Sequence, residues 1–257
     1  MTPARAAVSP MLVRLADERA TGVLVRDHGA LYLADGQIVH AESPAAPGLD
    51  ILLTANGRLA REGWDEAVQQ AGARREVARF LVDSGQVGDG ELEICHLGAL
   101  FDAAFFALAP GSGPTRFRYG VAHWIGRVRS VPADVVEREA IRRRQLLDSV
   151  WPYPEVDTAP VERRPTTPGP AATRRQRALL ELADGVRTPA DIARTLGRPA
   201  FNTLIDVRRL AAAGLVGTPA EPAAAAPHPL PSWVSEFPAD PDIALLRRLR
   251  DALEASL

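Results

Sequence analysis

The alternation of apolar and polar residues predicts a small antiparallel sheet near the N-terminus. In GVLVRDHGALYLADGQIVHAES, β-branched and apolar residues alternate with turn signals at residues 27–29 and 34–36, so three short strands are expected to pair as a meander. A short helical pattern over residues 11–20 precedes them. Residues 116–121 alternate in the same way and predict a strand that returns to the sheet.

After Gly48 the apolar residues follow the helical period instead. Residues 49–72 and 75–87 show this spacing, and a longer, strongly apolar helix is expected over residues 89–110. From Pro132 an amphipathic helix follows, with its acidic residues early and its arginines late, as the helix dipole favours. We therefore expect an α+β fold, in which helices cover a small antiparallel sheet.

Two proline-rich stretches divide the rest of the chain. Residues 152–172 and 220–238 are predicted to be linkers, because proline sustains neither a helix interior nor a central strand. The expected organisation is a sensor or interaction domain (1–151), a linker (152–172), a small domain (173–219), a Pro/Ala-rich linker (220–238) and an amphipathic C-terminal helix (239–257).

The small domain has the strongest local signals. Thr188, Pro189 and Asp191 combine a hydroxyl N-cap, a proline in the first turn and an acid at the third position, so a helix is predicted to start there. Gly197 supplies a turn, a further helix follows, and Leu-Val-Gly at residues 215–217 is expected to be a short strand. With a leading helix in TRRQRALLELADG, this order resembles a winged helix-turn-helix domain.

That resemblance makes duplex DNA a candidate partner. Residues 173–219 contain eight arginines and four acidic residues, a formal charge of +4 against −2 for the whole chain. The side chains expected to meet DNA are Arg198, Asn202, Thr203, Arg208 and Arg209. The alternative is that the domain binds a protein, since winged helices also serve as docking modules.

The N-terminal third resembles the PATAN domain, a bacterial signalling module. Its frame is a Thr-Gly pair entering a strand, a second strand ending in an Asp-Gly turn, and a third strand of the form Gly-x-Ile-Val-His-Ala. Here these positions are Thr21 and Gly22, Asp35 and Gly36, and residues 38–41. The resemblance implies a regulatory role, because such domains are fused to receiver or DNA-binding modules, and it implies no substrate or agreed ligand.

The composition excludes several classes of protein and kinds of binding site. The chain has a single cysteine, which excludes an internal disulfide framework and a cysteine-based zinc cluster. Neither a secretory signal nor an apolar run long enough for a membrane span is apparent, so a soluble cytoplasmic protein is expected. All basic residues are arginine, so arginine richness by itself says little about phosphate binding.

Two histidines are of types used in catalysis or ligand binding, but the sequence places no partner residues beside them that would form an active site. His40 lies on a predicted strand and Cys95 adjoins His96, but neighbouring helix residues point about 100° apart and do not form a nucleophilic pair. A structural role is expected for His40 and for Cys95. Trp124 with Arg127 and Arg129 is expected to belong to an amphipathic edge strand, the alternative being an aromatic and basic binding surface.

The function expected from the sequence is that of a cytoplasmic bacterial transcriptional regulator. It would bind duplex DNA through the winged helix and receive a signal or partner through the N-terminal domain. The alternative is an adaptor of a signalling complex, in which the winged helix or the C-terminal helix binds proteins. No catalytic residue, metal ligand or cofactor is assigned, and the oligomeric state stays open.

Overall fold

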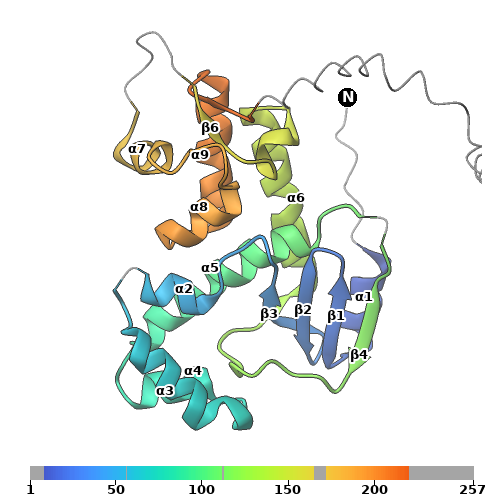
Figure 1. Cartoon of the computed structure of the whole chain (residues 1–257). Helices are drawn as coiled ribbons and strands as arrows, with labels where there is room; N and C mark the ends of the chain where they lie inside the picture. The colour runs from blue at the N-terminus through green and yellow to red at the C-terminus, as the bar shows by residue number, and fades with distance from the viewer. Residues whose placement is uncertain (1–8, 56, 112, 165–171, 220–257) are drawn as a thin grey trace, which may run out of the picture. The chain divides into compact units, whose positions relative to one another are not determined.

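Five antiparallel strands form one sheet in the computed structural model, which describes residues 9–55, 57–111, 113–164 and 172–219 (Figure 1). The strands are β1 (Gly22–Arg26), β2 (Gly29–Ala34), β3 (Gln37–Glu42), β4 (Arg116–Tyr119) and β5 (Val131–Pro132), and their order in the sheet is β4-β1-β2-β3-β5. The predicted meander and the returning strand are confirmed, and β5 was not predicted. The mixed helical and antiparallel architecture agrees with the α+β class.

Three helices pack against the sheet and complete its core. They are α1 (Pro10–Asp17), α5 (Asp89–Ala107) and α6 (Ala133–Val150), and α5 makes the most extensive contacts with β3 and β2. Leu31 and Ile38 from the sheet meet Leu100 of α5 and Val136 of α6, and all four side chains are fully buried. Alternating strand residues and helical spacing thus supply opposite sides of one core.

A second core surrounds the N-terminal half of α5. Helices α2 (Leu49–Thr54), α3 (Arg61–Ala71) and α4 (Val77–Asp83), with the 3₁₀ turn η1 (Gly72–Arg74), contribute to it. Trp64 and Leu81 pack there against Ile125, which belongs to the segment between β4 and β5. Residues 9–150 are called the sheet lobe below.

The helical lobe, residues 151–219, contains the predicted small domain. Its elements are η2 (Pro154–Asp157), β6 (Glu162–Arg163), α7 (Arg174–Leu180), α8 (Pro189–Leu196), α9 (Ala200–Ala212) and β7 (Val216–Gly217). The Thr188–Asp191 capping box and the left-handed Gly197 are present where the sequence predicted them. The helix-helix-helix-strand order is therefore present, although the partner of β7 is β6, which precedes α7 in the chain.

The first part of the expected linker is ordered structure, which corrects that expectation. Residues 154–157 form a 3₁₀ turn and residues 162–163 pair with β7. Val156 and Val161 are buried in the core of the helical lobe, so apolar residues between the prolines anchor the segment. Both lobes belong to one compact unit that ends at Pro219.

The remaining predicted segments lie outside the described residues. These are residues 165–171 of the first linker, the second linker, 220–238, and the C-terminal helix, 239–257. Within the part of the chain that is described, no helix is long and apolar enough to cross a membrane.

Gly22, the glycine of the Thr-Gly pair, is required by the close approach of β4. A Cβ atom at this position would lie 2.2 Å from the carbonyl oxygen of Arg118 and 2.8 Å from the ring of Phe117. We expect Gly22→Ala to lower the free energy of unfolding by about 1 to 3 kcal/mol, because backbone atoms must move to relieve this overlap. Urea denaturation measures the change.

Gly98→Ala is the matched control for Gly22→Ala. Gly98 lies inside α5, and a Cβ atom there would meet no heavy atom within 4 Å apart from its chain neighbours and the backbone of its own helix. We expect this variant to be neutral or up to about 1 kcal/mol more stable, because alanine favours the helix. Equal destabilisation by both substitutions would contradict the explanation by close approach.

Candidate functional site

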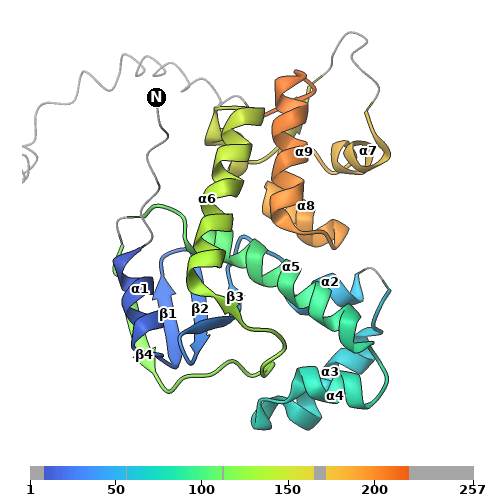
Figure 2. The ribbon, with the colours of Figure 1, turned by 180° about the vertical axis from the view of Figure 1, so that it is seen from behind.

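The helix expected to contact DNA packs against the sheet lobe. Helix α9 contacts α6 along its length and also reaches α5, and Figure 2 shows α6 and α9 side by side. Asn202 and Arg209 are exposed, as expected, and Arg198 is partly exposed and donates a hydrogen bond to the carbonyl of Arg175. Thr203 and Arg208 are buried, with exposed fractions of 3% and 2%. The five predicted residues therefore do not share one surface.

Arg208 is bound to other residues of the protein, which corrects its assignment to DNA. Its guanidinium donates two hydrogen bonds to the carboxylate of Asp157, at 2.8 and 2.6 Å, and another to Asp148 at 3.2 Å. It also donates to the carbonyl of Trp151. These acceptors raise the pKa of Arg208, with Asp157 contributing most, so the guanidinium stays charged. Arg208 joins α9 to α6 and η2.

Thr203 is also not placed to meet DNA. Its hydroxyl donates a hydrogen bond to the carbonyl of Pro199 at 3.2 Å, one turn earlier in the same helix. Since the side chain is buried in the protein, the prediction that it faces a groove is wrong.

The N-terminus of α9 is capped by a side chain from the sheet lobe. Asp102 of α5 accepts hydrogen bonds from the backbone N–H groups of Ala200 at 2.6 Å and Phe201 at 2.8 Å. The carboxyl group is fully buried, which raises its pKa, while these two N–H groups and the nearby Arg143 act in the opposite direction. Helix N-termini bind anions because their first N–H groups lack partners, and here Asp102 supplies the anion.

Apolar contacts reinforce this junction between the lobes. Phe105 and Leu147 of the sheet lobe form a small buried cluster with Phe201 and Leu204 of α9. The guanidinium of Arg143 lies 4.7 Å from the centre of the Phe201 ring, at cation–π distance. The contact between α9 and the sheet lobe is thus apolar at its centre, with Asp102 and Arg143 of the sheet lobe at the N-terminus of α9 and Arg208 of α9 further along.

A mainly apolar cavity of about 560 Å³ lies beside the junction. Its lining includes Phe105, Phe106 and Leu147 from the sheet lobe and Ala190 and Leu204 from the helical lobe. Pockets that bind small molecules have this size and apolar character. A ligand here would contact both lobes.

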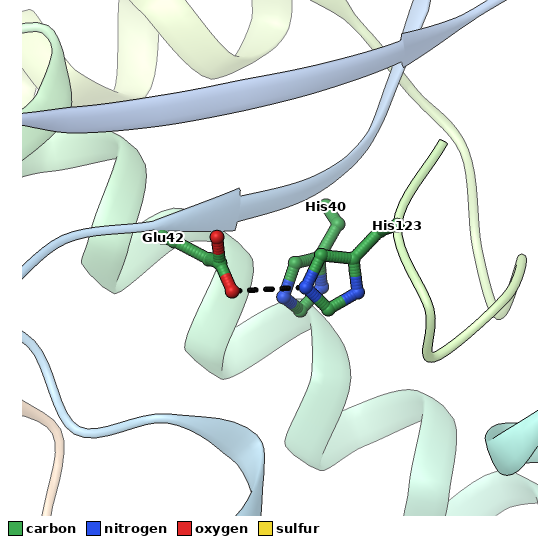
Figure 3. A group of neighbouring side chains, drawn as sticks. All are labelled: His40, Glu42 and His123. Carbon is green, nitrogen blue, oxygen red and sulfur yellow. Dashed lines mark hydrogen bonds and ion pairs between the residues drawn. The ribbon is translucent and has the colours of Figure 1, made fainter. Parts of the chain in front are cut away.

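A cluster of histidines lies on β3, on α5 and after β4, away from the junction. Figure 3 shows His40 and Glu42 projecting from β3 toward His123, with the two imidazole rings facing each other. The ring centres of His40 and His123 are 3.9 Å apart, and His123 Nε2 lies 2.9 Å from Glu42 Oε1. His96 of α5 reaches the cluster from the core, with its Nε2 3.4 Å from His40 Nδ1. Three of the four histidines that the structure describes are therefore gathered here.

Burial keeps two of these imidazoles neutral. It lowers the pKa of His40 well below its usual value, and His123 and His96 lower it further. Burial likewise lowers the pKa of His96 to about 4, against an opposing effect of the Val39 main chain. The hydrogen bond from His123 lowers the pKa of Glu42, which stays ionised at neutral pH. Neutral imidazole and ionised carboxylate are the forms that bind metal ions.

Glu42 and His123 are each oriented by a second hydrogen bond, on the side away from their contact with one another. Tyr32 donates from its hydroxyl to the other oxygen of Glu42 at 3.0 Å. The backbone N–H of Ile125 donates to His123 Nδ1 at 3.2 Å, so the proton of the neutral ring lies on Nε2, facing Glu42. A cavity of about 500 Å³ opens beside the cluster and is lined by His40, Glu42 and His123.

The histidine cluster was not predicted from the sequence, although one signal was present. His40 and Glu42 are two residues apart on a strand, a spacing that places both side chains on one face. His123 could not be paired with them from spacing, because it lies 81 residues beyond Glu42. His96 was noted only with Cys95, whose thiol instead faces Arg58.

The expected edge strand around Trp124 is absent from the described structure at residues 120–130, where the chain is irregular with a turn at residues 124–125. Trp124 is 38% exposed and packs edge-on against Trp64. Arg127 pairs with Asp35 at 3.1 Å and Arg129 with Glu93 at 3.4 Å, so both arginines are held in ion pairs.

Comparisons with known proteins found no relative of this chain. No family model, no curated protein sequence and no solved structure matches the chain.

Proposed function

We propose that the protein is a regulatory adaptor, in which a PATAN-like sheet lobe carries a winged-helix-like lobe and the assembled surface binds a protein partner. The observation that carries this proposal is the capping of α9 by Asp102. A helix that reads DNA presents its N-terminal residues to base edges, and here the backbone of that end is held by a carboxylate of the sheet lobe, with Asn202 the one exposed side chain of the first turn. The buried Arg208 anchors the same helix further along.

The cavity beside the junction supports a regulatory role. Because its walls come from both lobes, a small molecule bound there would favour one arrangement of α9 against α5 and α6. Such a ligand would alter the surface offered to a partner without any chemical reaction. The residues of α9 left exposed for a partner are Asn202, Arg209 and Ala212, and Ile205 between them is partly buried against the junction.

Transcriptional regulation through DNA is the second candidate. One observation favours it: Arg174 and Arg177 of α7 are exposed, in the same lobe as the exposed Arg209, although Arg175 between them pairs with Asp206 at 3.5 Å. DNA contact in this form would involve mainly phosphates, since Ala200, Phe201 and Thr203 at the start of α9 are buried and Asn202 alone is exposed there.

Fluorescence anisotropy of the full chain with a labelled duplex at low salt tests the two candidates. We expect no salt-dependent binding at micromolar protein, and no difference between the wild type and Asn202→Ala or Arg209→Ala. Phosphate neutralisation would instead give a steep salt dependence. Tight, salt-sensitive binding that weakens in Arg209→Ala but not in Arg118→Ala, an exposed control on β4, would overturn the adaptor proposal.

Site-specific photo-crosslinking in cells supplies the second part of the test. A photoreactive residue at position 209 is expected to give adducts that resist nuclease and are cleaved by protease, and the same probe at position 118 is expected to give none of them. Adducts at position 209 that disappear on nuclease treatment would favour the DNA-binding regulator.

A further inference from the structure

We propose that His40, Glu42 and His123 form a binding site for a first-row divalent transition-metal ion such as Zn²⁺. One ligand atom from each residue lies within 4.8 Å of the others. Around a tetrahedral zinc ion with bonds of about 2.0 to 2.2 Å, ligand atoms are about 3.4 Å apart. The three groups therefore need shifts of about an ångström to close on one ion, and Glu42 is a long side chain with 47% exposure that can make such a shift. Because the His40 and His123 rings are stacked, with centres 3.9 Å and planes 28° apart, one ring must also turn so that both nitrogen lone pairs point at the ion.

The partners of His40 suit a metal ligand. Its Nδ1 faces His96 Nε2, which leaves Nε2 as the ring nitrogen not engaged by His96. With its proton on Nδ1, His40 donates a hydrogen bond to His96. The lone pair of His40 Nε2 is then left for the metal ion. Histidine ligands commonly donate their second ring N–H in this way, which fixes the tautomer and the ring orientation. His96 is thus a positioning residue for His40.

Glu42 is also held by a hydrogen bond on the side away from the proposed metal ion. Tyr32 donates to its Oε2, while Oε1 faces His123 Nε2. A cation would take the place of the proton now lying between Oε1 and Nε2. For His123 to remain neutral, that proton moves to Nδ1, and the hydrogen bond from Ile125 is lost. The free energy gained from the metal–ligand bonds has to exceed the cost of moving this proton and losing this hydrogen bond.

The donor set selects the class of ion. Two imidazoles and one carboxylate suit zinc, cobalt, nickel or iron(II), whereas Mg²⁺ and Ca²⁺ prefer oxygen ligands. Three protein ligands leave at least one coordination position open. The cavity of about 500 Å³ beside the cluster, lined also by Trp64 and Trp124, gives that position room for water or a small anion.

Metal titration of the full chain, first treated with a chelator, tests the site. All variants carry His228→Ala, because His228 lies outside the described residues and is, with His28, one of the two histidines outside the cluster that could compete. We expect one equivalent of Zn²⁺ to bind in competition with a chromophoric chelator. Co²⁺ is expected to give the intense visible absorption of a four- or five-coordinate site, and Mg²⁺ to give no competition.

Two variants and one control decide whether the binding belongs to the cluster. Glu42→Gln removes an ionised ligand from a half-exposed position where the fold tolerates change, and we expect at least a tenfold loss of Zn²⁺ affinity. His123→Ala is expected to abolish the Co²⁺ absorption. The control, His28→Ala, changes an exposed histidine in the β1–β2 turn and should leave both readouts unchanged.

The opposite results would overturn the proposal. They are an affinity for Zn²⁺ that Glu42→Gln leaves within a factor of two, a Co²⁺ spectrum like that of the hydrated ion, or binding that His28→Ala weakens as much as His123→Ala. Circular dichroism of each variant confirms that it is folded. None of these outcomes depends on whether the helical lobe binds protein or DNA.

Discussion

Arg208→Ala is expected to lower the free energy of unfolding by about 3 to 5 kcal/mol, because it leaves buried carboxylate and carbonyl groups without their cation. The Asp157 carboxylate accepts two hydrogen bonds from this guanidinium and is itself only 17% exposed. Asp148 is 67% exposed and can return to solvent, so the cost arises mainly at Asp157 and Trp151. Urea denaturation followed by circular dichroism measures the change.

Arg209→Ala is the matched control for Arg208→Ala, because it removes the same side chain from the next position of α9, where it is exposed. We expect an effect within about 0.5 kcal/mol of zero. Arg208→Lys should lie between the two, because lysine keeps the charge but loses the paired hydrogen bonds to Asp157. Equal effects of Arg208→Ala and Arg209→Ala would show that the Asp157 contact does not stabilise the junction.

Local signals in the sequence were enough to predict most of the elements. The turns at residues 27–29 and 34–36 define the meander, because they join strands that are neighbours in the chain. The capping box at Thr188 and Asp191 and the left-handed glycine that follows α8 also depend only on adjacent residues. Strand β5, only two residues long, carries no such signal and exists because it pairs with β3.

Packing between distant segments was not predictable in the same way. Arg208 was assigned to DNA as a basic residue of the third helix, yet it follows Leu204 by four residues and precedes Ala211 by three. That spacing places it on the buried face, where charge is tolerated only because Asp157 pairs with it. The partner lies in a segment expected to be a linker, so the wrong prediction there concealed the role of Arg208.

The histidine cluster was likewise only partly predictable, because it joins segments that are distant in the sequence. His40 and Glu42 share a strand face, which sequence spacing reveals, but the groups that complete the cluster come from α5 and from the segment after β4. A β-bulge between Leu33 and Tyr32 of β2 and their partners on β3 also shifts the register just before His40. A strict two-residue alternation across β3 therefore would not have identified which residues lie on each face.

Asp102→Ala is expected to weaken the attachment of α9 to the sheet lobe, with a loss of about 2 to 4 kcal/mol in the free energy of unfolding. Two buried N–H groups, those of Ala200 and Phe201, lose their acceptor, and each buried donor without a partner costs about 1 to 3 kcal/mol. Asp102→Asn should cost less, because one amide oxygen can still accept. Hydrogen exchange of the two amides, followed by NMR, reports the local effect directly.

Glu93→Gln supplies the control on the same helix, since Glu93 of α5 pairs with Arg129 at the surface, at 3.4 Å, and contributes to no helix cap. Such an exposed pair is worth at most about 1 kcal/mol, so Glu93→Gln should leave amide exchange in α9 unchanged. In Asp102→Ala we expect exchange at Ala200 and Phe201 to accelerate more than exchange in β1–β3, because the junction opens before the sheet does. Uniform acceleration across both lobes would instead mean that Asp102 stabilises the unit as a whole, and α9 could then not separate from α5 as an independent step.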